Sequence, residues 1–339
     1  MARLRENVSL KSLNTFGLDV AARWFMTLDS EQETLEFLMD NLHQNQPFMV
    51  LGGGSNVLFR HDYPGLILHN QILGKEVVDE TEDFVWLKVG AGEVWHELVL
   101  YTLSQNWGGL QNLSLIPGSV GAAPIQNIGA YGVELKDVFH SLEALHIGTG
   151  AVHEIDHTGC QFGYRDSIFK RKAKGQYIII SVTLKLEKKP QLNTSYGAIK
   201  AELELMGVEP GIHTISQAVI RIRQSKLPDP AQIGNSGSFF KNPVVPLSVL
   251  QAIQERYEQV PHYPVSQDDV KLPAGWLIEK CGWKGYRRDN YGVHDRQALV
   301  LVNHGGASGD DIYQLSSEIL RSVSDQFGIQ LEREVNVIG

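Results

Sequence analysis

The stretch IPGSVGAAPIQNIGAYG, residues 116–132, contains no charged residue, and eight of its seventeen residues are Gly, Ala or Ser. It is too rich in Gly and Pro for a long helix and too interrupted for a long strand. Small residues let the backbone approach another flat surface, and Gly permits turns that align N–H groups. Taken alone, the stretch fits either a wrap around a large, partly polar cofactor or a tightly packed structural loop.

A second glycine-rich segment, Gly52-Gly53-Gly54-Ser55-Asn56, follows an expected buried strand at 48–51. Strands that run into glycines commonly present backbone N–H groups to phosphate. The dinucleotide fingerprint fails because Val57 stands where it needs Gly, and no Gly-Lys-Ser/Thr run is present. No helical pattern follows either. The segment is therefore a candidate phosphate loop of neither common type, or a simple turn between two strands.

Composition limits the class of protein. A chain of 339 residues predicts two or three domains, and 42% hydrophobic with 20% charged residues is typical of a soluble globular protein. The net charge of −9 argues against nucleic acid as the main partner. We expect no signal peptide and no membrane span. Cys160 and Cys281 show no metal spacing and are expected to be core residues in a reduced, cytoplasmic protein, and the twelve histidines show no ligand spacing.

Hydrophobic periodicity predicts a mixed α and β chain. A capping box of Ser30 and Glu33 is expected to start a helix with Leu35, Leu38, Met39 and Leu42 on one face. Further helices are expected at 93–105, 196–206, 214–223, 246–259, 275–280 and from a cap of Ser308 and Asp311 to about 327. Strands are expected at 22–27, 48–51, 57–59, 66–68, 84–89, 141–147, 152–155, 176–186 and 299–303.

Two extended segments in the last third carry polar residues at regular spacing. A turn at 234–237 is expected to lead into a strand at 238–241, which would place Ser238, Phe240 and Asn242 on one face. The chain is expected to end in an alternating strand with Glu332, Glu334 and Asn336 on its polar side. The segment 207–211 (GVEPG) is a candidate domain boundary, and the basic run 170–172 is expected to be a solvated face.

Seven motifs occur along the chain in a fixed order. They are NTFG (14–17), LGGGSN (51–56), IPGSVGAAPIQNIGAYG (116–132), FGYRDS (162–167), SKLPDP (225–230), GSFFKNP (237–243) and AGWLIEKCGWKG (274–285). Together they resemble the UDP-N-acetylenolpyruvoylglucosamine reductases, flavoenzymes that make UDP-N-acetylmuramic acid for bacterial peptidoglycan. The resemblance covers residues 14–338, and Tyr196 with the segment 262–264 is similar to the longer subtype, which carries a tyrosine-bearing loop over the substrate.

The resemblance implies an α+β protein with a two-part FAD-binding region of the vanillyl-alcohol-oxidase (PCMH) type and a C-terminal substrate-binding α+β domain. The implied limits are 1–74 for the first FAD part, 75–210 with 328–339 for the second, and 211–327 for the substrate domain. FAD is expected to be bound without a covalent link, with NADPH as co-substrate. The residues that match the family's FAD contacts are Gly52, Gly53, Gly54, Ser55, Asn56, Pro117, Gly118, Ser119, Gly121, Ala123, Asn127, Gly129, Tyr131 and Arg223.

The implied reaction transfers hydride from flavin N5 to C3 of the enolpyruvyl ether of UDP-N-acetylglucosamine and adds a proton at C2. Arg165 matches the arginine that stabilises the growing enolate charge, and Ser238 matches the proton donor. Glu334 matches the catalytic glutamate, which would act protonated or by orienting Arg165 or a water. Without the family, each residue has an ordinary alternative: a turn arginine, a turn serine and a solvated carboxylate.

Substrate contacts are implied at Tyr196 and Lys226 for the diphosphate, with Asn242, Tyr263 and Lys271 in the matching region. The expected partner is thus a small molecule, with no nucleic acid, no membrane, no metal and a monomeric chain. Two other functions stay open on the sequence. A flavin oxidase of the same cofactor fold would react rapidly with oxygen, and a nucleotide-sensing or flavin-carrying module would bind without NADPH-dependent bleaching.

Overall fold

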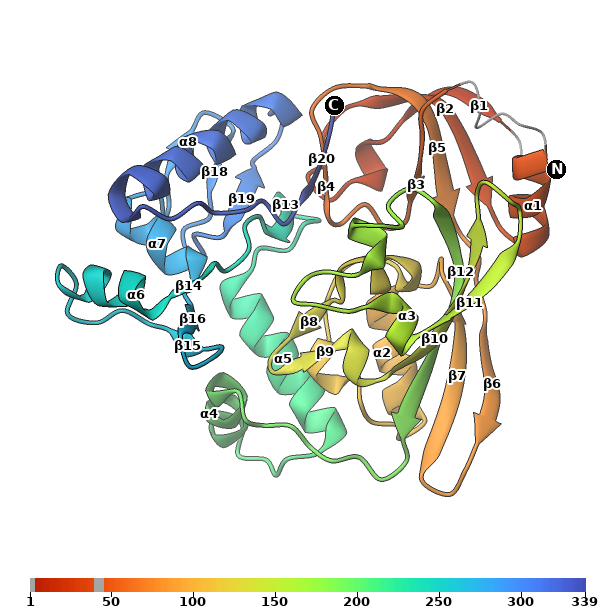
Figure 1. Ribbon diagram of the computed structural model, residues 1–339, viewed down its shortest axis with the longest axis horizontal. Helices are drawn as coiled ribbons and strands as arrows, with labels where there is room; N and C mark the ends of the chain where they lie inside the picture. The colour runs from red at the N-terminus through yellow and green to blue at the C-terminus, as the bar shows by residue number, and fades with distance from the viewer. Residues whose placement is uncertain (1–3, 40–45) are drawn as a thin grey trace. The chain divides into compact units, whose positions relative to one another are not determined.

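The computed structural model describes residues 4–39 and 46–339 (Figure 1). The chain forms two compact units, and both take residues from several parts of the sequence. Among the described residues, unit 1 comprises 4–8, 22–39, 46–54 and 64–225, and unit 2 comprises 9–21, 55–63 and 226–339. The domain limits expected from the sequence stay a prediction.

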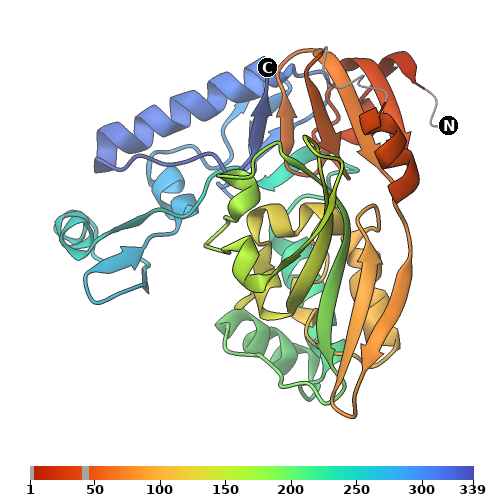
Figure 2. The same cartoon turned by 45° about the vertical axis from the view of Figure 1, so that its right-hand side comes forward.

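Unit 1 contains two main sheets. The first has the strand order β1-β2-β5-β3, in which β3 and β5 are parallel; its strands are β1 (Arg5–Ser9), β2 (Ala21–Leu28), β5 (Tyr63–Asn70) and β3 (Phe48–Leu51). The second is antiparallel with the order β11-β10-β12-β7-β6; its strands are β11 (Val152–Asp156), β10 (Phe139–His146), β12 (Tyr177–Glu187), β7 (Phe84–Gly90) and β6 (Lys75–Glu80). The long strands of this second sheet are conspicuous in Figure 2.

The helices of unit 1 cover these sheets and create its cores. They are α1 (Glu31–Met39), α2 (Trp95–Ser104), α3 (His157–Cys160), α4 (Gly197–Met206) and α5 (Ile212–Lys226). Apolar residues of α2 pack with β7 and β12, because alternate residues of these strands face the helix. Strand β12 also packs with β2, β5 and α1, and α4 packs against α5. A short hairpin of β8 (Gly129–Ala130) and β9 (Val133–Glu134) lies within the central glycine-rich region.

Unit 2 is built from three small sheets and three helices. The four-stranded sheet has the order β13-β19-β18-β17, with β13 (Gly234–Ser238), β19 (Val300–Asn303), β18 (Tyr291–Val293) and β17 (Arg287–Arg288). A second has the order β14-β16-β15, with β14 (Val244–Pro246), β16 (Asp269–Lys271) and β15 (Tyr263–Pro264). The third pairs β4 (Val57–Phe59) in parallel with β20 (Asn336–Ile338).

The helices of unit 2 are α6 (Leu247–Gln254), α7 (Ala274–Lys280) and α8 (Gly309–Phe327). Helix α8 packs against β18, β19, α7 and β4. It begins with the expected capping box, in which the Ser308 hydroxyl accepts from Asp311 N and the Asp311 carboxylate accepts from Ser308 N. Gly309 is required at this start, because a Cβ there would lie 1.8 Å from Phe59 O.

Most expected strands and helices are confirmed within one to three residues, but some expectations are wrong. Met39 does not lie on the buried face of α1, since it is 75% exposed; Leu42 lies outside the described residues. Helix α6 ends at Gln254 rather than at 259. The alternating final strand is regular only at 336–338, although Arg333 makes an isolated bridge with Phe240.

The expected turn at 234–237 is also corrected. These residues form β13, and the strand ends at Ser238 instead of beginning there. Asn235 pairs with Val302 of β19, and Ser238 pairs with Val300. Strand β13 therefore advances by three residues where β19 advances by two, and this mismatch is a β-bulge. Ser238 is exposed, whereas Phe239 and Phe240 are both buried, so burial does not alternate beyond the end of β13. The expected shared face of Ser238, Phe240 and Asn242 stays a prediction.

No helix of the described ranges is long and apolar enough to cross a membrane.

Candidate active site

The two glycine-rich segments lie against each other in unit 1. A Cβ on Gly52 would meet Ser119 Oγ at 2.0 Å, and a Cβ on Gly53 would meet Gly118 Cα at 3.1 Å. Only glycine permits this approach, because any side chain would separate the two backbones. The loop after β3 and the start of the 116–132 stretch therefore form one glycine-lined surface, which we call the glycine cradle and define by Gly52, Gly53, Gly118 and Ser119.

The 116–132 stretch is fixed by backbone hydrogen bonds to the turn between β7 and α2. Val120 N donates to Glu93 O at 2.8 Å, Gly121 N donates to Ala91 O at 2.8 Å, and Trp95 N donates to Gly118 O at 3.0 Å. A Cβ on Gly121 would lie 2.6 Å from Ala91 Cβ. Ala123 is 1% exposed and belongs to the core, whereas Pro117 is exposed beside the cradle. Gly121 and Ala123 thus serve packing.

Asn127 connects three segments of unit 1. Its side chain is fully buried, and its Nδ2 donates to Glu134 Oε2 at 3.1 Å and to Gly163 O at 3.0 Å. Its Oδ1 accepts from Lys136 N at 3.0 Å. Because the amide bonds to protein groups at both ends, any contribution to cofactor binding is indirect, through the shape of the loop.

Arg165 lies in a tight turn that docks on the same stretch. Its φ is +53°, a left-handed conformation that costs a non-glycine residue about 1 kcal/mol. The Ser167 hydroxyl donates to Ile125 O at 2.7 Å, and Nη2 of Arg165 donates to Gly129 O. Nη1 lies 4.0 Å from Glu134 Oε1, and the Arg165 side chain is 19% exposed. The structure therefore holds a partly buried guanidinium beside the expected cofactor loop.

A second arginine in unit 1 has the environment of a ligand-binding group. Burial lowers the pKa of the Arg223 guanidinium, an effect that the nearby Tyr131 hydroxyl opposes. Its Nε is buried and donates no hydrogen bond to any residue that the structure describes. A buried polar atom without a hydrogen-bond partner is costly. The guanidinium thus fits an acceptor group of a bound ligand such as FAD, and the glycine cradle fits backbone contacts to such a ligand.

Tyr131 and Tyr196 meet beside Arg223. Their rings pack edge to face with centroids 5.3 Å apart. Burial raises the pKa of the Tyr131 hydroxyl, which the charge of Arg223 partly offsets. Two expected contacts, one to cofactor and one to substrate, are therefore neighbours in unit 1.

Sequence reasoning missed two residues of this region, His96 and Asn112. His96 Nδ1 accepts from Leu115 N at 3.0 Å, and burial lowers the pKa of its imidazole, with Arg223 contributing. The Asn112 Nδ2 donates to Tyr131 O at 3.1 Å and to Asn193 O at 3.0 Å, while its Oδ1 is buried without a described partner. Single His and Asn residues in an amphipathic pattern gave no signal of these contacts.

Within unit 2, Ser238 and Glu334 lie on paired segments. Glu334 N donates to Phe239 O at 2.8 Å, and Lys241 N donates to Glu332 O at 2.9 Å. Gly237 has φ of +70°, so the bulge turns Ser238 outward at the end of β13. Two of the three expected catalytic residues thus lie on segments that pair through their backbones, although they are distant in sequence.

Asn56, from the expected phosphate loop, joins the same part of unit 2. Its Nδ2 donates to Glu334 O at 3.4 Å, and its own carbonyl accepts from Asn336 N at 3.1 Å. The C-terminal tail, residues 331–338, therefore contacts the end of the glycine-rich segment 52–56. Within that segment Gly54 has φ of +59° and Ser55 is half-buried.

Three expected substrate contacts also converge in unit 2. Tyr263 and Lys271 are directly opposite each other in the antiparallel pair β15–β16. Asn242 precedes β14, which pairs with the other edge of β16. Its Oδ1 accepts from Ala274 N at 2.9 Å, at the start of α7. This bond holds the amide at the start of the helix. Lys226 is the last residue of α5.

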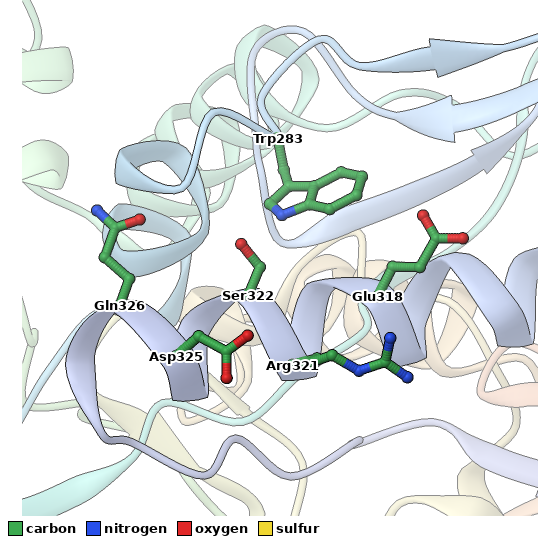
Figure 3. Close-up of a pocket in the computed structure, with 6 residues that line it drawn as sticks. All are labelled: Trp283, Glu318, Arg321, Ser322, Asp325 and Gln326. Carbon is green, nitrogen blue, oxygen red and sulfur yellow. The ribbon is translucent and has the colours of Figure 1, made fainter.

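A separate shallow pocket of about 430 Å³ lies beside α8 in unit 2 (Figure 3). Trp283 forms one side, and α8 supplies Glu318, Arg321, Ser322, Asp325 and Gln326. No expected site residue lines it. Among the described residues, no three His, Cys, Asp or Glu side chains are grouped so as to hold a metal ion. Cys160 is buried as expected, with burial raising its thiol pKa to about 12, but Cys281 is only half-buried.

Two family models match the chain. The model described as "FAD binding domain" matches residues 22–156, and that described as "UDP-N-acetylenolpyruvoylglucosamine reductase, C-terminal domain" matches residues 229–338. The UDP-N-acetylenolpyruvoylglucosamine reductase of Amoebophilus asiaticus is 49% identical over 99% of both chains. The chain belongs to this reductase family. The enzyme of the same name from Chromobacterium violaceum is 46% identical over 98% of both chains.

Solved structures agree on the fold. The family's reductase from Thermus caldophilus matches with a TM-score of 0.70, covers both chains fully and is 24% identical. A solvent-stable cholesterol oxidase matches at 0.52 with 12% identity, covering 98% of this chain and 87% of its own. The expected combination of a PCMH-type FAD-binding region with the family's C-terminal domain is confirmed.

Proposed function

We propose that this chain is a UDP-N-acetylmuramate dehydrogenase, an FAD-containing oxidoreductase of peptidoglycan precursor synthesis. Its substrate would be the enolpyruvyl ether of UDP-N-acetylglucosamine, and NADPH would be the reductant. The observation that carries the mechanism is the pairing in unit 2 that places Ser238 and Glu334 on adjacent segments. Bound FAD would receive hydride from NADPH and supply it from N5 to C3 of the enolpyruvyl group.

The role of Arg165 follows from charge. Hydride addition at C3 leaves negative charge on the enolate and its carboxylate, and a planar guanidinium can bind such a group through two parallel hydrogen bonds. The contacts of Arg165 with Gly129 O and Glu134 hold its guanidinium in one orientation before substrate arrives.

Ser238 is the proposed donor of the proton to C2. A hydroxyl is a weak acid, but an enolate carbon is strongly basic, so a fixed weak acid suffices. The bulge and the buried neighbours Phe239 and Phe240 restrict where the hydroxyl can lie. Glu334, on the paired segment, would assist in its protonated form or by orienting Arg165 or a water.

Binding of the UDP diphosphate would use Lys226 and Tyr196, and Asn242, Tyr263 and Lys271 would also contact the substrate. The position of Tyr196 at the start of α4, packed on Tyr131, supports assignment to the longer subtype. We further propose cytoplasmic location, a monomer, and domain limits near 74, 210 and 327.

The test is Ser238→Ala, followed as two half-reactions by anaerobic stopped-flow absorbance of the flavin. NADPH should bleach the variant at the wild-type rate. Oxidation by the enolpyruvyl substrate should slow by about 10²–10⁴, the usual contribution of a general acid. Equal loss in both half-reactions would make Ser238 structural, and wild-type protein that NADPH does not bleach would contradict the proposed function.

A further inference from the structure

The tail that carries Glu334 is attached to α8 by the residue before it. Arg333 Nε donates to Ser316 Oγ at 2.8 Å, and Nη2 donates to Ser317 Oγ at 2.7 Å. Its guanidinium carbon also lies 4.5 Å from the centroid of the Tyr313 ring. All three partners are on α8, so one side chain makes a three-point attachment to a rigid helix.

The attachment is part of a larger cluster. Arg60 lies 4.3 Å from the centroid of the same Tyr313 ring and binds Asp310 at 2.9 and 2.6 Å. Arg60 N also donates to Ile338 O at 2.9 Å, which extends the pairing of β4 with β20 (Figure 1). The cluster of Arg60, Asp310, Tyr313 and Arg333 thus connects α8 with the strand after the phosphate loop and with the tail.

The tail around Glu334 also has backbone bonds, which run to Phe239, Lys241 and Asn56, and an ion pair of Glu332 with Lys241. The attachment of Arg333 differs from these because it joins the tail to α8. In an extended segment, adjacent side chains leave the backbone on opposite sides. Anchoring Arg333 on α8 therefore sets the direction in which the Glu334 side chain points.

We propose that Arg333 is a positioning residue for Glu334, whose carboxylate it keeps in place by its attachment to Ser316, Ser317 and Tyr313. The inference rests on the proposed function, in which Glu334 acts when substrate oxidises the reduced flavin. Arginine is required because its planar fork reaches two hydroxyls while it stacks on a ring, whereas a lysine ammonium is a single point charge.

The test combines substitutions at Arg333 and Glu334 in the holoenzyme, with both half-reactions measured by stopped flow. Arg333→Met should leave bleaching by NADPH unchanged and slow oxidation by substrate about 10-fold to 100-fold, the effect of misplacing a reacting group by about 1 Å. Arg333→Lys should lie between this variant and wild type. In a Glu334→Gln background, Arg333→Met should cause less than a roughly twofold further loss, because the group it positions is gone.

Glu332→Gln is the matched control, since it alters the neighbouring exposed carboxylate, which pairs with Lys241 at 2.9 Å; both rates should stay at wild-type values. An equal fold-loss from Arg333→Met in both backgrounds would overturn the inference and make the residue structural. If Arg333→Met does not fold, Arg333→Lys and Ser316→Ala carry the same comparison. Wild-type rates for Glu334→Gln would overturn this inference alone, whereas a wild-type protein inert to NADPH and substrate would refute the proposed function itself.

Discussion

The close approach of the two glycine-rich segments makes a quantitative prediction for Gly52→Ala. The new Cβ would lie 2.0 Å from Ser119 Oγ and 3.1 Å from Ser119 Cβ. Ser119 is 7% exposed, so its hydroxyl has little room to rotate away. Overpacking of this kind costs about 1–3 kcal/mol, and we expect the lower half of that range because the clashing atom ends a short side chain.

A second substitution, Ser119→Ala, tests whether the contact with Ser119 causes the loss of stability. Ser119→Ala removes the atom at 2.0 Å but keeps the Cβ at 3.1 Å. The double variant Gly52→Ala/Ser119→Ala should therefore recover part of the lost stability, by about 0.5–1 kcal/mol relative to additivity. Gly197→Ala is the matched control, because a Cβ there has nothing within 4 Å; it should be neutral or slightly stabilising.

Urea unfolding would give the free energies, and flavin fluorescence would give the affinity for FAD. A separation of the two backbones by the added methyl should weaken FAD binding about 10-fold or more, since about 1.4 kcal/mol corresponds to a factor of ten. Wild-type stability and wild-type FAD affinity for Gly52→Ala would refute the cradle. Strict additivity in the double variant would refute the assigned contact.

Two further predictions concern acid stability and the tyrosine loop. Burial lowers the pKa of four histidines below the usual 6.5, namely His69, His96, His294 and His304. The unfolded chain therefore takes up protons first, and the free energy of unfolding should fall as the pH decreases from about 6.5 to 5. The fall should be smaller for His96→Gln, and urea unfolding midpoints at several pH values measure both effects. Asn193 bonds Gly132 O at 3.1 Å and both Ser195 N and Oγ. Asn193→Ala should therefore raise the KM for the UDP substrate about 5-fold to 30-fold through a looser Tyr196 loop, for a loss of about 1–2 kcal/mol, while an unchanged KM in steady-state assays would exclude that role.

Much of the fold follows from local pattern. The strand 48–51, the hairpin at 141–155 and the cap of α8 were predictable because alternation, a Gly-containing turn and a Ser–Asp pair act over a few residues. Strand β6 was not predicted, since KEVVDE is almost entirely exposed and has no alternation. The bulge in β13 was invisible for a different reason: a GNSGS sequence fits a turn as well as a bulged strand, and pairing with the distant β19 decides between them.

The candidate site likewise depends partly on local motifs and partly on contacts between distant segments. Motifs predict Arg165, Ser238 and Glu334 as site residues, but several contacts around the candidate residues join segments that are distant in sequence. Asn127 illustrates this, because its amide donates to Gly163 O, 36 residues further along the chain. The isolated buried Nε of Arg223 likewise depends on the packing around α5, which no local pattern encodes.

The parallel pair β4–β20 has a consequence for synthesis of the protein. All three residues of β4 are buried, yet their pairing partners at 336–338 follow them in the chain by 279 residues (336 − 57). A ribosome extends the chain from the N-terminus at about 5–20 residues per second, so this strand waits roughly 14–56 s for its partner. A nascent chain truncated before residue 336 would leave an apolar edge exposed, and chaperone capture should be strongest for such fragments.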